Sequence, residues 1–156
     1  MTWSPGRDRI DELLAAQDLE RVTADDVLAE RLIDDATRHL TTAAAGVAAG
    51  DLAGAYQLTY DAFRKSAAAL LAAQGLRATS RGGHVAVQEA VNAQFTTSVG
   101  VFRSFGRIRR ARNSYEYPDT DSAGPSTDDV QDAIRAATAA RDAASTILGQ
   151  NILTPW

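Results

Sequence analysis

The stretch that decides the fold is DLAGAYQLTYDAFRKSAAALLAAQ, residues 51–74. Its large side chains recur every three or four residues, which is the spacing of one face of an α-helix. The residues on this face are Leu52, Tyr56, Tyr60, Phe63, Ala67 and Leu70. Asp51 is suited to cap the start of the helix, and Gly75 is typical of the position just after a helix end. The pattern therefore predicts a long helix with one buried face.

Similar spacing predicts further helices on both sides of this one, and no run of alternating apolar residues predicts a sheet. The expected helices cover residues 4–17, 23–49, 84–96, 98–117 and 128–148. Thr23 is the expected N-cap of the second helix, whose inward residues would be Leu28, Leu32, Ala36, Leu40 and Val47. Pro118 stops the fifth helix, and Ser126 or Thr127 caps the last one. We expect an all-α fold, an up-and-down antiparallel bundle of four to five main helices with short connections.

Three segments are expected along the chain. Residues 1–22 would form an N-terminal helical extension, residues 23–150 the helical bundle, and residues 151–156 a short apolar tail. The tail would dock either on the body of the protein or on a partner.

Composition narrows the class of protein. The chain has 156 residues, of which 45% are hydrophobic and 23% charged, as in a soluble globular domain. It contains no cysteine, which excludes disulfides and thiolate metal sites. No segment reaches the roughly 18 apolar residues of a membrane helix. The two histidines stand alone in the sequence, so we expect no metal, and we expect no cofactor. The lack of a long apolar segment leads us to expect no membrane contact, and the lack of cysteine fits a cytoplasmic location.

Basic charge gathers in RSFGRIRRARN, residues 103–113, which holds five arginines and no acid in a chain of net charge −4. A local arginine cluster attracts phosphate even when the whole chain is acidic. Arg103, Arg107 and Arg110 are spaced to form one polar stripe on a helix, whereas Arg109 and Asn113 flank the line of Arg112. This stripe is either a solvated face paired with acids elsewhere, which we expect, or a contact surface for nucleic acid.

Arg112 lies on the opposite, inward-facing line of this helix, with Phe105, Ile108 and Tyr115. An arginine there needs a partner, because desolvating an unpaired charge is costly. Glu116 follows one turn later, and Asp61 of the helix over residues 51–74 is within plausible reach. Arg112 is thus either a structural tether of the helix end or a phosphate-binding group in a groove between two subunits.

Four segments together resemble a HEPN domain, over roughly residues 25–150. They are AYQLTYDAFRKSAAALLAAQG (55–75), GGHV (82–85), AVNAQF (90–95) and RRARNSYEYP (109–118). The last is similar to the motif Arg-Asn-x-x-Glu-Tyr-Pro of small actinobacterial HEPN proteins. The resemblance implies a helical bundle that dimerises and brings two Arg-x(4–6)-His motifs into one cleft. It further implies metal-independent RNA cleavage in active members, and frequent pairing with a nucleotidyltransferase in toxin–antitoxin systems.

The sequence departs from that motif at one position. Arg112 and Asn113 match its start, but Tyr117 stands where the family has its histidine. A tyrosine with a pKa near 10 is a poor proton acceptor at neutral pH. The first hypothesis is therefore a homodimeric HEPN-like module of a toxin–antitoxin or defence system, with a degenerate nuclease motif, that binds RNA or a partner protein. The binding residues expected are Arg103, Arg107, Arg109, Arg110, Tyr115 and Asp61.

Two alternatives remain open at the level of sequence. One is an active metal-independent ribonuclease, in which Arg112 holds phosphate while Asn113, Tyr115 or Tyr117 positions the 2′-hydroxyl. The resemblance also implies that Tyr117 is a candidate for nucleotidylation by a partner enzyme. The other alternative is a purely structural dimer, in which Arg112 and Glu116 tether the helix end. His84, at the start of a predicted helix, is expected to pack or to cap that helix.

Overall fold

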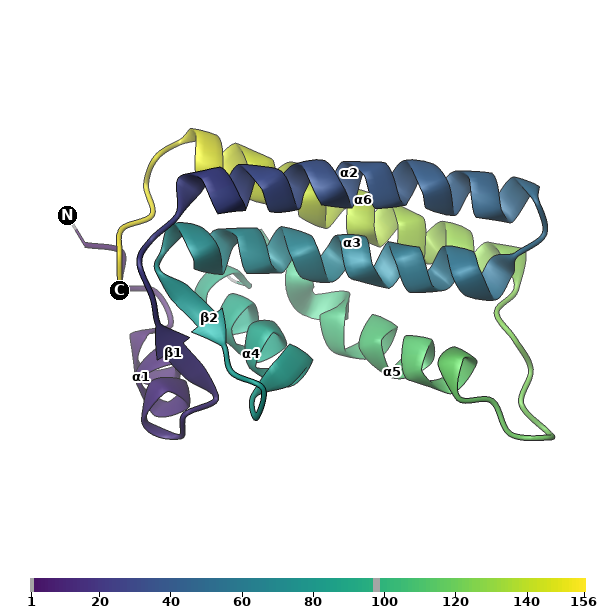
Figure 1. Ribbon diagram of the computed structural model, residues 1–156, viewed down its shortest axis with the longest axis horizontal. Helices are drawn as coiled ribbons and strands as arrows, with labels where there is room; N and C mark the ends of the chain where they lie inside the picture. The colour runs from purple at the N-terminus through teal and green to yellow at the C-terminus, as the bar shows by residue number, and fades with distance from the viewer. Residues whose placement is uncertain (1, 97–98) are drawn as a thin grey trace.

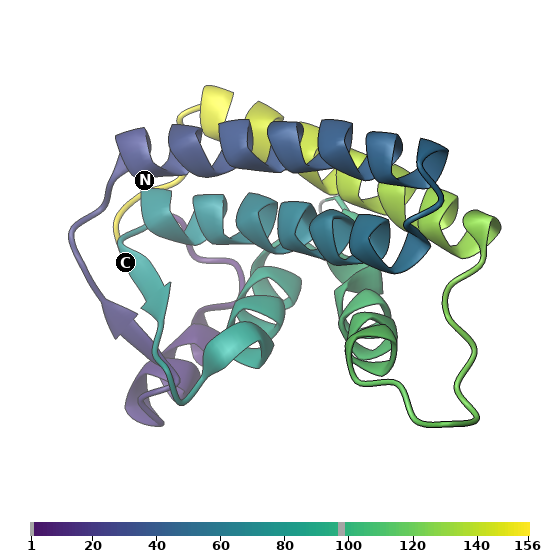
Figure 2. The same cartoon turned by 45° about the vertical axis from the view of Figure 1, so that its right-hand side comes forward.

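The fold is a helical bundle built around one central helix. The computed structural model describes residues 2–96 and 99–156. Three long helices pack against one another (Figure 1): α2 (Asp26–Ala48), α3 (Leu52–Ala73) and α6 (Thr127–Gly149). The shorter helices α4 (Gly83–Phe95) and α5 (Phe105–Glu116) pack against the other side of α3, and α1 (Arg7–Ala15) packs on α4 (Figure 2). The predicted helical architecture is confirmed at this level.

Helix starts follow the chemistry of their caps. Asp51 caps α3 as predicted, because its Oδ1 accepts a hydrogen bond of 2.9 Å from the Gly54 N–H. Ser126 caps α6 in a reciprocal pair with Asp129. The prediction that Thr23 caps α2 is wrong, since Asp25 accepts from the Leu28 N–H at 2.8 Å instead.

A small antiparallel sheet joins strands β1 (Leu19–Arg21) and β2 (Leu76–Ala78), so the prediction of no sheet is wrong. Strands of three residues are too short to show an alternating pattern, and their pairing joins residues 57 positions apart in the chain. Gly75 makes the pairing possible. Its φ of 68° favours glycine, and a Cβ there would lie 2.6 Å from the Val22 carbonyl oxygen.

The order of the helices differs from a simple up-and-down bundle. Helices α2 and α3 run in opposite directions, but α6 runs in the same direction as α3 (Figure 1). The reason is the long connection from α3 to α6, in which α4 and α5 pass beneath α3 before the chain returns to the long helices (Figure 1). The segment predicted as one helix from Ser98 has its start outside the described residues; it continues as a 3₁₀ turn (Val101–Ser104) and then α5.

The core is rich in aromatic rings at the face where α3 meets α4 and α5. The ring centroid of Phe63 lies 5.1 Å from that of Phe105 and 5.9 Å from that of Phe102, both in edge-to-face contact. Ile10 of α1 belongs to the same buried cluster as the bundle. Leu28 was predicted to be buried but is 43% exposed, because it lies in the first turn of α2 and borders a pocket between α2 and α3.

Both chain ends dock on this core. Trp3 Nε1 donates to the side-chain oxygen of Gln94 at 2.8 Å, and Gln94 in turn pairs with buried Gln74. The backbone N–H of Trp156 donates to the Gln74 carbonyl oxygen at 2.9 Å. Of the two positions considered for the tail, it therefore takes the one on the body. None of the helices that the structure describes is long and apolar enough to cross a membrane.

Candidate functional site

A histidine and a tyrosine meet where α4 packs on α3. His84 lies in the first turn of α4, directly after the Gly82-Gly83 turn. Its Nδ1 is 2.7 Å from the hydroxyl oxygen of Tyr60, a residue of α3 whose side chain is otherwise buried. The sequence suggested only that His84 packs or caps, so this hydrogen bond gives the imidazole a definite orientation.

Arg112 approaches the same tyrosine from α5. Its guanidinium carbon lies 5.5 Å from the centre of the Tyr60 ring, in cation–π geometry. Its Nε donates to Gln57 at 2.9 Å, and its Nη1 donates to the Asn113 side-chain oxygen at 3.0 Å. The pair with Glu116 expected from the sequence is present at 2.6 Å. Arg112 is therefore held in place by side chains of two helices, and only 18% of its side chain is exposed.

Two more arginines flank the histidine. Arg64 lies one turn beyond Tyr60 on α3 and makes a long ion pair of 3.5 Å with Asp61. Arg109 of α5 is half-buried, and its Nε donates to the Gln88 side chain of α4 at 3.2 Å. Asp61 thus pairs with Arg64 rather than with Arg112. We call Tyr60, Arg64, His84, Arg109 and Arg112 the histidine–arginine site.

Burial and positive charge set the protonation states of this site. Burial lowers the pKa of His84 from its usual value, and the charges of Arg64, Arg112 and Arg109 lower it further, against the opposing effect of Asp61. Burial raises the pKa of Tyr60 to about 12. At neutral pH the imidazole is therefore neutral and the phenol protonated. In the tautomer that carries its proton on Nδ1, His84 donates to the Tyr60 oxygen and Nε2 can accept a proton; in the other tautomer the Tyr60 hydroxyl donates to Nδ1.

We expect NMR titration to place the pKa of His84 below 6.5, and replacing Arg64 with methionine to raise it, because one of the charges that lower it is removed. Below pH 6.5 an unfolded chain protonates this histidine while the folded chain does not. The stability associated with His84 is therefore fully present above pH 6.5 and falls as the pH drops towards the folded-state pKa. A pKa at or above 6.5 in the wild-type protein contradicts the prediction.

The arginine stripe is exposed and lacks acidic partners. Arg103, Arg107 and Arg110 all point to solvent. Among the residues that the structure describes, no carboxylate lies within 4.0 Å of these three or of Arg109. The expectation that acids elsewhere in the chain pair with this stripe is wrong, because none of the ion pairs among the described residues includes one of its arginines. The stripe therefore presents unneutralised positive charge beside the histidine–arginine site.

A shallow pocket of about 270 Å³ opens beside Arg112, between α3 and α5. Its walls include Tyr115, whose ring packs edge-on against Tyr56 at 4.9 Å. Tyr117 lies past the helix end with 76% of its surface exposed, and its side chain makes no hydrogen bond within the described part of the chain. The structure thus places Arg112, Asn113 and Tyr115 together and leaves Tyr117 apart from them.

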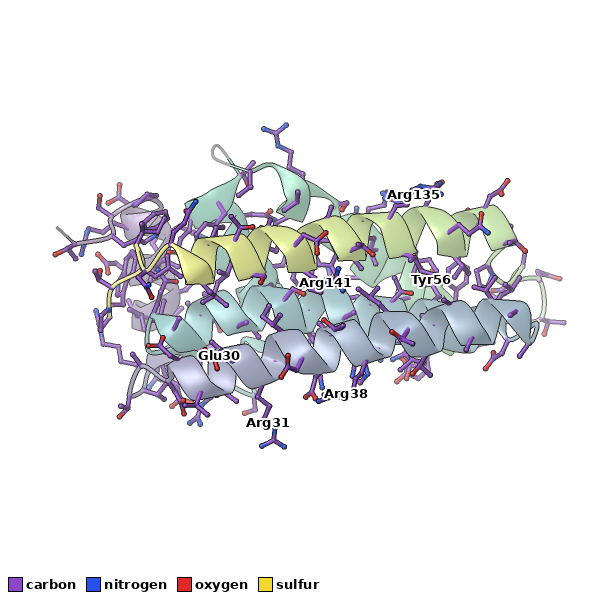
Figure 3. All side chains as sticks on the ribbon, turned by 90° about the horizontal axis from the view of Figure 1, so that it is seen from above. Glu30, Arg31, Arg38, Tyr56, Arg135 and Arg141 are labelled. Atoms are coloured by element: carbon purple, nitrogen blue, oxygen red, sulfur yellow. The ribbon has the colours of Figure 1, made fainter. Side chains whose placement is uncertain are left out.

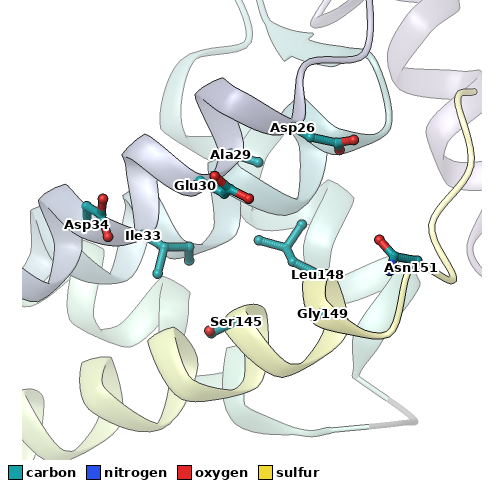
Figure 4. A pocket seen from close by; sticks show the side chains of 9 residues that line it. All are labelled: Asp26, Ala29, Glu30, Ile33, Asp34, Ser145, Leu148, Gly149 and Asn151. Carbon is teal, nitrogen blue, oxygen red and sulfur yellow. The ribbon is translucent and has the colours of Figure 1, made fainter.

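A larger depression of about 560 Å³ lies away from α5, between α2 and α6 (Figure 4). Its polar rim carries the carboxylates of Asp26, Glu30 and Asp34, with Ser145 on the facing helix. Acidic side chains repel phosphate, so the two depressions differ in the charge of the ligand that they favour. In residues 2–96 and 99–156, no group of three or more acids and histidines is placed to hold a metal ion.

The sequence analysis missed His84 as a member of the site, together with the residues that position it. Gln57, Tyr60 and Arg64 follow one another at spacings of three and four, so their common face on α3 was readable. The contact of Tyr60 with His84 was not, because it depends on the angle at which α4 crosses α3. Comparison with protein-family models, curated proteins and solved structures found no match to this chain.

Proposed function

We propose that this protein is an RNA-binding module, which contacts phosphates through the arginines of the 3₁₀ turn and α5. The observation that carries the proposal is the unneutralised stripe of Arg103, Arg107 and Arg110 beside the histidine–arginine site. Arginine suits this task because its planar group donates two parallel hydrogen bonds to a phosphate. The net charge of −4 keeps the attraction local to this face.

We further propose that this module works as a homodimer together with a partner system. The resemblance to HEPN domains supports a homodimer in a toxin–antitoxin or defence system, in which the ends of two α5 helices form one groove. The exposed Tyr117 ring at that end offers a surface on which a base stacks. A nucleotidyltransferase or another partner protein bound at the same end is the variant of this proposal that does not involve RNA.

The double variant Arg107→Gln/Arg110→Gln tests the proposal. We expect it to bind a fluorescein-labelled single-stranded RNA about tenfold more weakly than the wild-type protein in anisotropy titrations at 100 mM salt. The slope of log K against log salt should become shallower by about 1.4, since each phosphate contact to a single strand contributes about 0.7. Both residues are exposed, so the fold should be retained.

The control is the double variant Arg21→Gln/Arg31→Gln, which changes the net charge by the same amount. Arg31 projects outward from α2 (Figure 3), and Arg21 is exposed on β1. We expect this variant to bind RNA within about twofold of the wild type, because its charges lie away from the stripe. Equal losses in the two double variants would mean that net charge, not the stripe, governs binding.

A second candidate function is metal-independent cleavage of RNA at the same site. The observation that favours it is the neutral imidazole of His84, hydrogen-bonded to the same Tyr60 side chain that Arg112 contacts. In such a reaction His84 Nε2 accepts the proton of a 2′-hydroxyl, whose oxygen attacks the neighbouring phosphorus. The bond to the 5′-oxygen breaks, that oxygen takes up a proton, and a 2′,3′-cyclic phosphate remains. Arg112 and Arg109 would hold the phosphate oxygens.

A further inference from the structure

A third, mostly apolar pocket lies between α2 and α3, next to the small sheet. It has a volume of about 490 Å³ and is enclosed by α2, α3, α4 and strand β2. This size is typical of sites for small molecules. Its apolar lining includes Leu71, Leu76 and Val87, all buried, and Leu28 at the rim. Leu28 is 43% exposed because it lies at the opening of this pocket.

One donor atom of the arginine at this pocket lacks a hydrogen-bond acceptor. The Nε of Arg64 is buried and finds no hydrogen-bond acceptor among the described residues. The only ion pair that Arg64 makes there is the long one of 3.5 Å with Asp61. Leaving a charged donor without an acceptor is costly. The Arg64 side chain as a whole is 26% exposed, so the site favours a ligand that brings an anionic oxygen to this incompletely paired guanidinium.

The other charged groups at the pocket are already engaged. Arg77 pairs with Glu20 across the small sheet at 2.8 Å. The carboxylate of Asp25 caps α2 by accepting the Leu28 N–H. Arg64 is thus the lining residue whose buried donor is left unsatisfied, in a mostly apolar pocket.

We propose that this pocket binds a small carboxylic acid with a single apolar chain of about eight carbons. The carboxylate accepts from the Arg64 guanidinium, and the chain lies among Leu71, Leu76 and Val87. Charge complementarity and the apolar lining together select this class of ligand. An alcohol of the same length lacks the charge, and a short acid lacks the apolar contact.

Titration calorimetry with octanoate, octanol and butyrate tests the proposal on the full chain. We expect octanoate to bind one to one and octanol at least tenfold more weakly. Butyrate should bind at least a hundredfold more weakly, since each buried methylene contributes about fourfold. In methyl NMR spectra octanoate should shift Leu71 and Val87. Equal affinities for octanoate and octanol, or no shift of these methyl groups, would overturn the proposal.

Three variants locate the binding within the chain. Arg64→Met should abolish the preference for octanoate over octanol, whereas Arg77→Gln should leave it unchanged. Leu28→Glu places a negative charge at the exposed rim, where the fold tolerates it, and should weaken octanoate binding at least fivefold. Octanoate affinity that is unchanged in both Arg64→Met and Leu28→Glu contradicts the site.

RNA binding is measured on the same preparations of the Leu28→Glu variant. Leu28 lies outside the arginine stripe and the histidine–arginine site, so its RNA affinity should equal that of the wild type. Failure of octanoate to bind while RNA binds removes the pocket proposal alone. Failure of RNA to bind while octanoate binds removes the proposed function alone.

Discussion

With a single-stranded RNA substrate and EDTA present, the ribonuclease candidate predicts that the His84→Gln variant cleaves at least about a hundredfold more slowly than the wild-type protein. The reason is that proton transfer by a positioned side chain contributes roughly 10²- to 10⁴-fold to a rate. Glutamine keeps a polar side chain of similar length near Tyr60 but cannot take up a proton. Denaturing gels measure the rate, and the 2′,3′-cyclic phosphate ends of the products identify the chemistry.

The His39→Gln variant is the matched control, since it removes the other histidine of the chain, on α2. Its cleavage rate should equal that of the wild type. A wild-type protein that binds RNA but leaves it intact would reject the ribonuclease and retain the RNA-binding module. Cleavage that survives in His84→Gln would mean that another group, or a contaminating nuclease, is responsible.

The fold was largely predictable because its signals are local. The caps at Asp51 and Ser126, the stop before Pro118 and the inward face of α3 each depend on residues within one or two turns. The small sheet was not predictable, because three-residue strands carry no periodic pattern. The exposure of Leu28 depends on how the first turn of α2 packs beside α3, which helical spacing does not specify.

The candidate site was only half predictable for a similar reason. Helical phase correctly separated the exposed stripe of Arg103, Arg107 and Arg110 from Arg112, and it pointed to Glu116 as a partner. The position of His84 beside Arg112 arises from the packing of α4 and α5 on the same face of α3. The motif-based expectation placed the proton-transfer position at Tyr117, close in sequence to Arg112. In the folded chain a histidine from another helix, His84, contacts the same Tyr60 side chain as Arg112.

A buried pair of glutamine amides joins the end of α3 to α4 and also binds Trp3 of the N-terminal segment. Gln74 and Gln94 exchange hydrogen bonds of 2.7 and 3.1 Å, and the Gln94 oxygen also accepts from Trp3 Nε1. Both glutamines are at most 1% exposed. A buried polar group that loses its partner cannot turn to water, so each such group costs about 1–3 kcal/mol.

The Gln94→Met variant is therefore expected to lower the free energy of unfolding by about 3–4 kcal/mol, measured by urea denaturation. Methionine has nearly the shape of glutamine, but it leaves the amide of Gln74 and the indole N–H of Trp3 without partners. The double variant Gln74→Met/Gln94→Met removes both amides and should lose less than the sum of the two single variants, because replacing both partners leaves fewer polar groups unsatisfied. Strictly additive losses would show that the two amides do not depend on each other, and that the link between α3 and α4 rests on apolar packing alone.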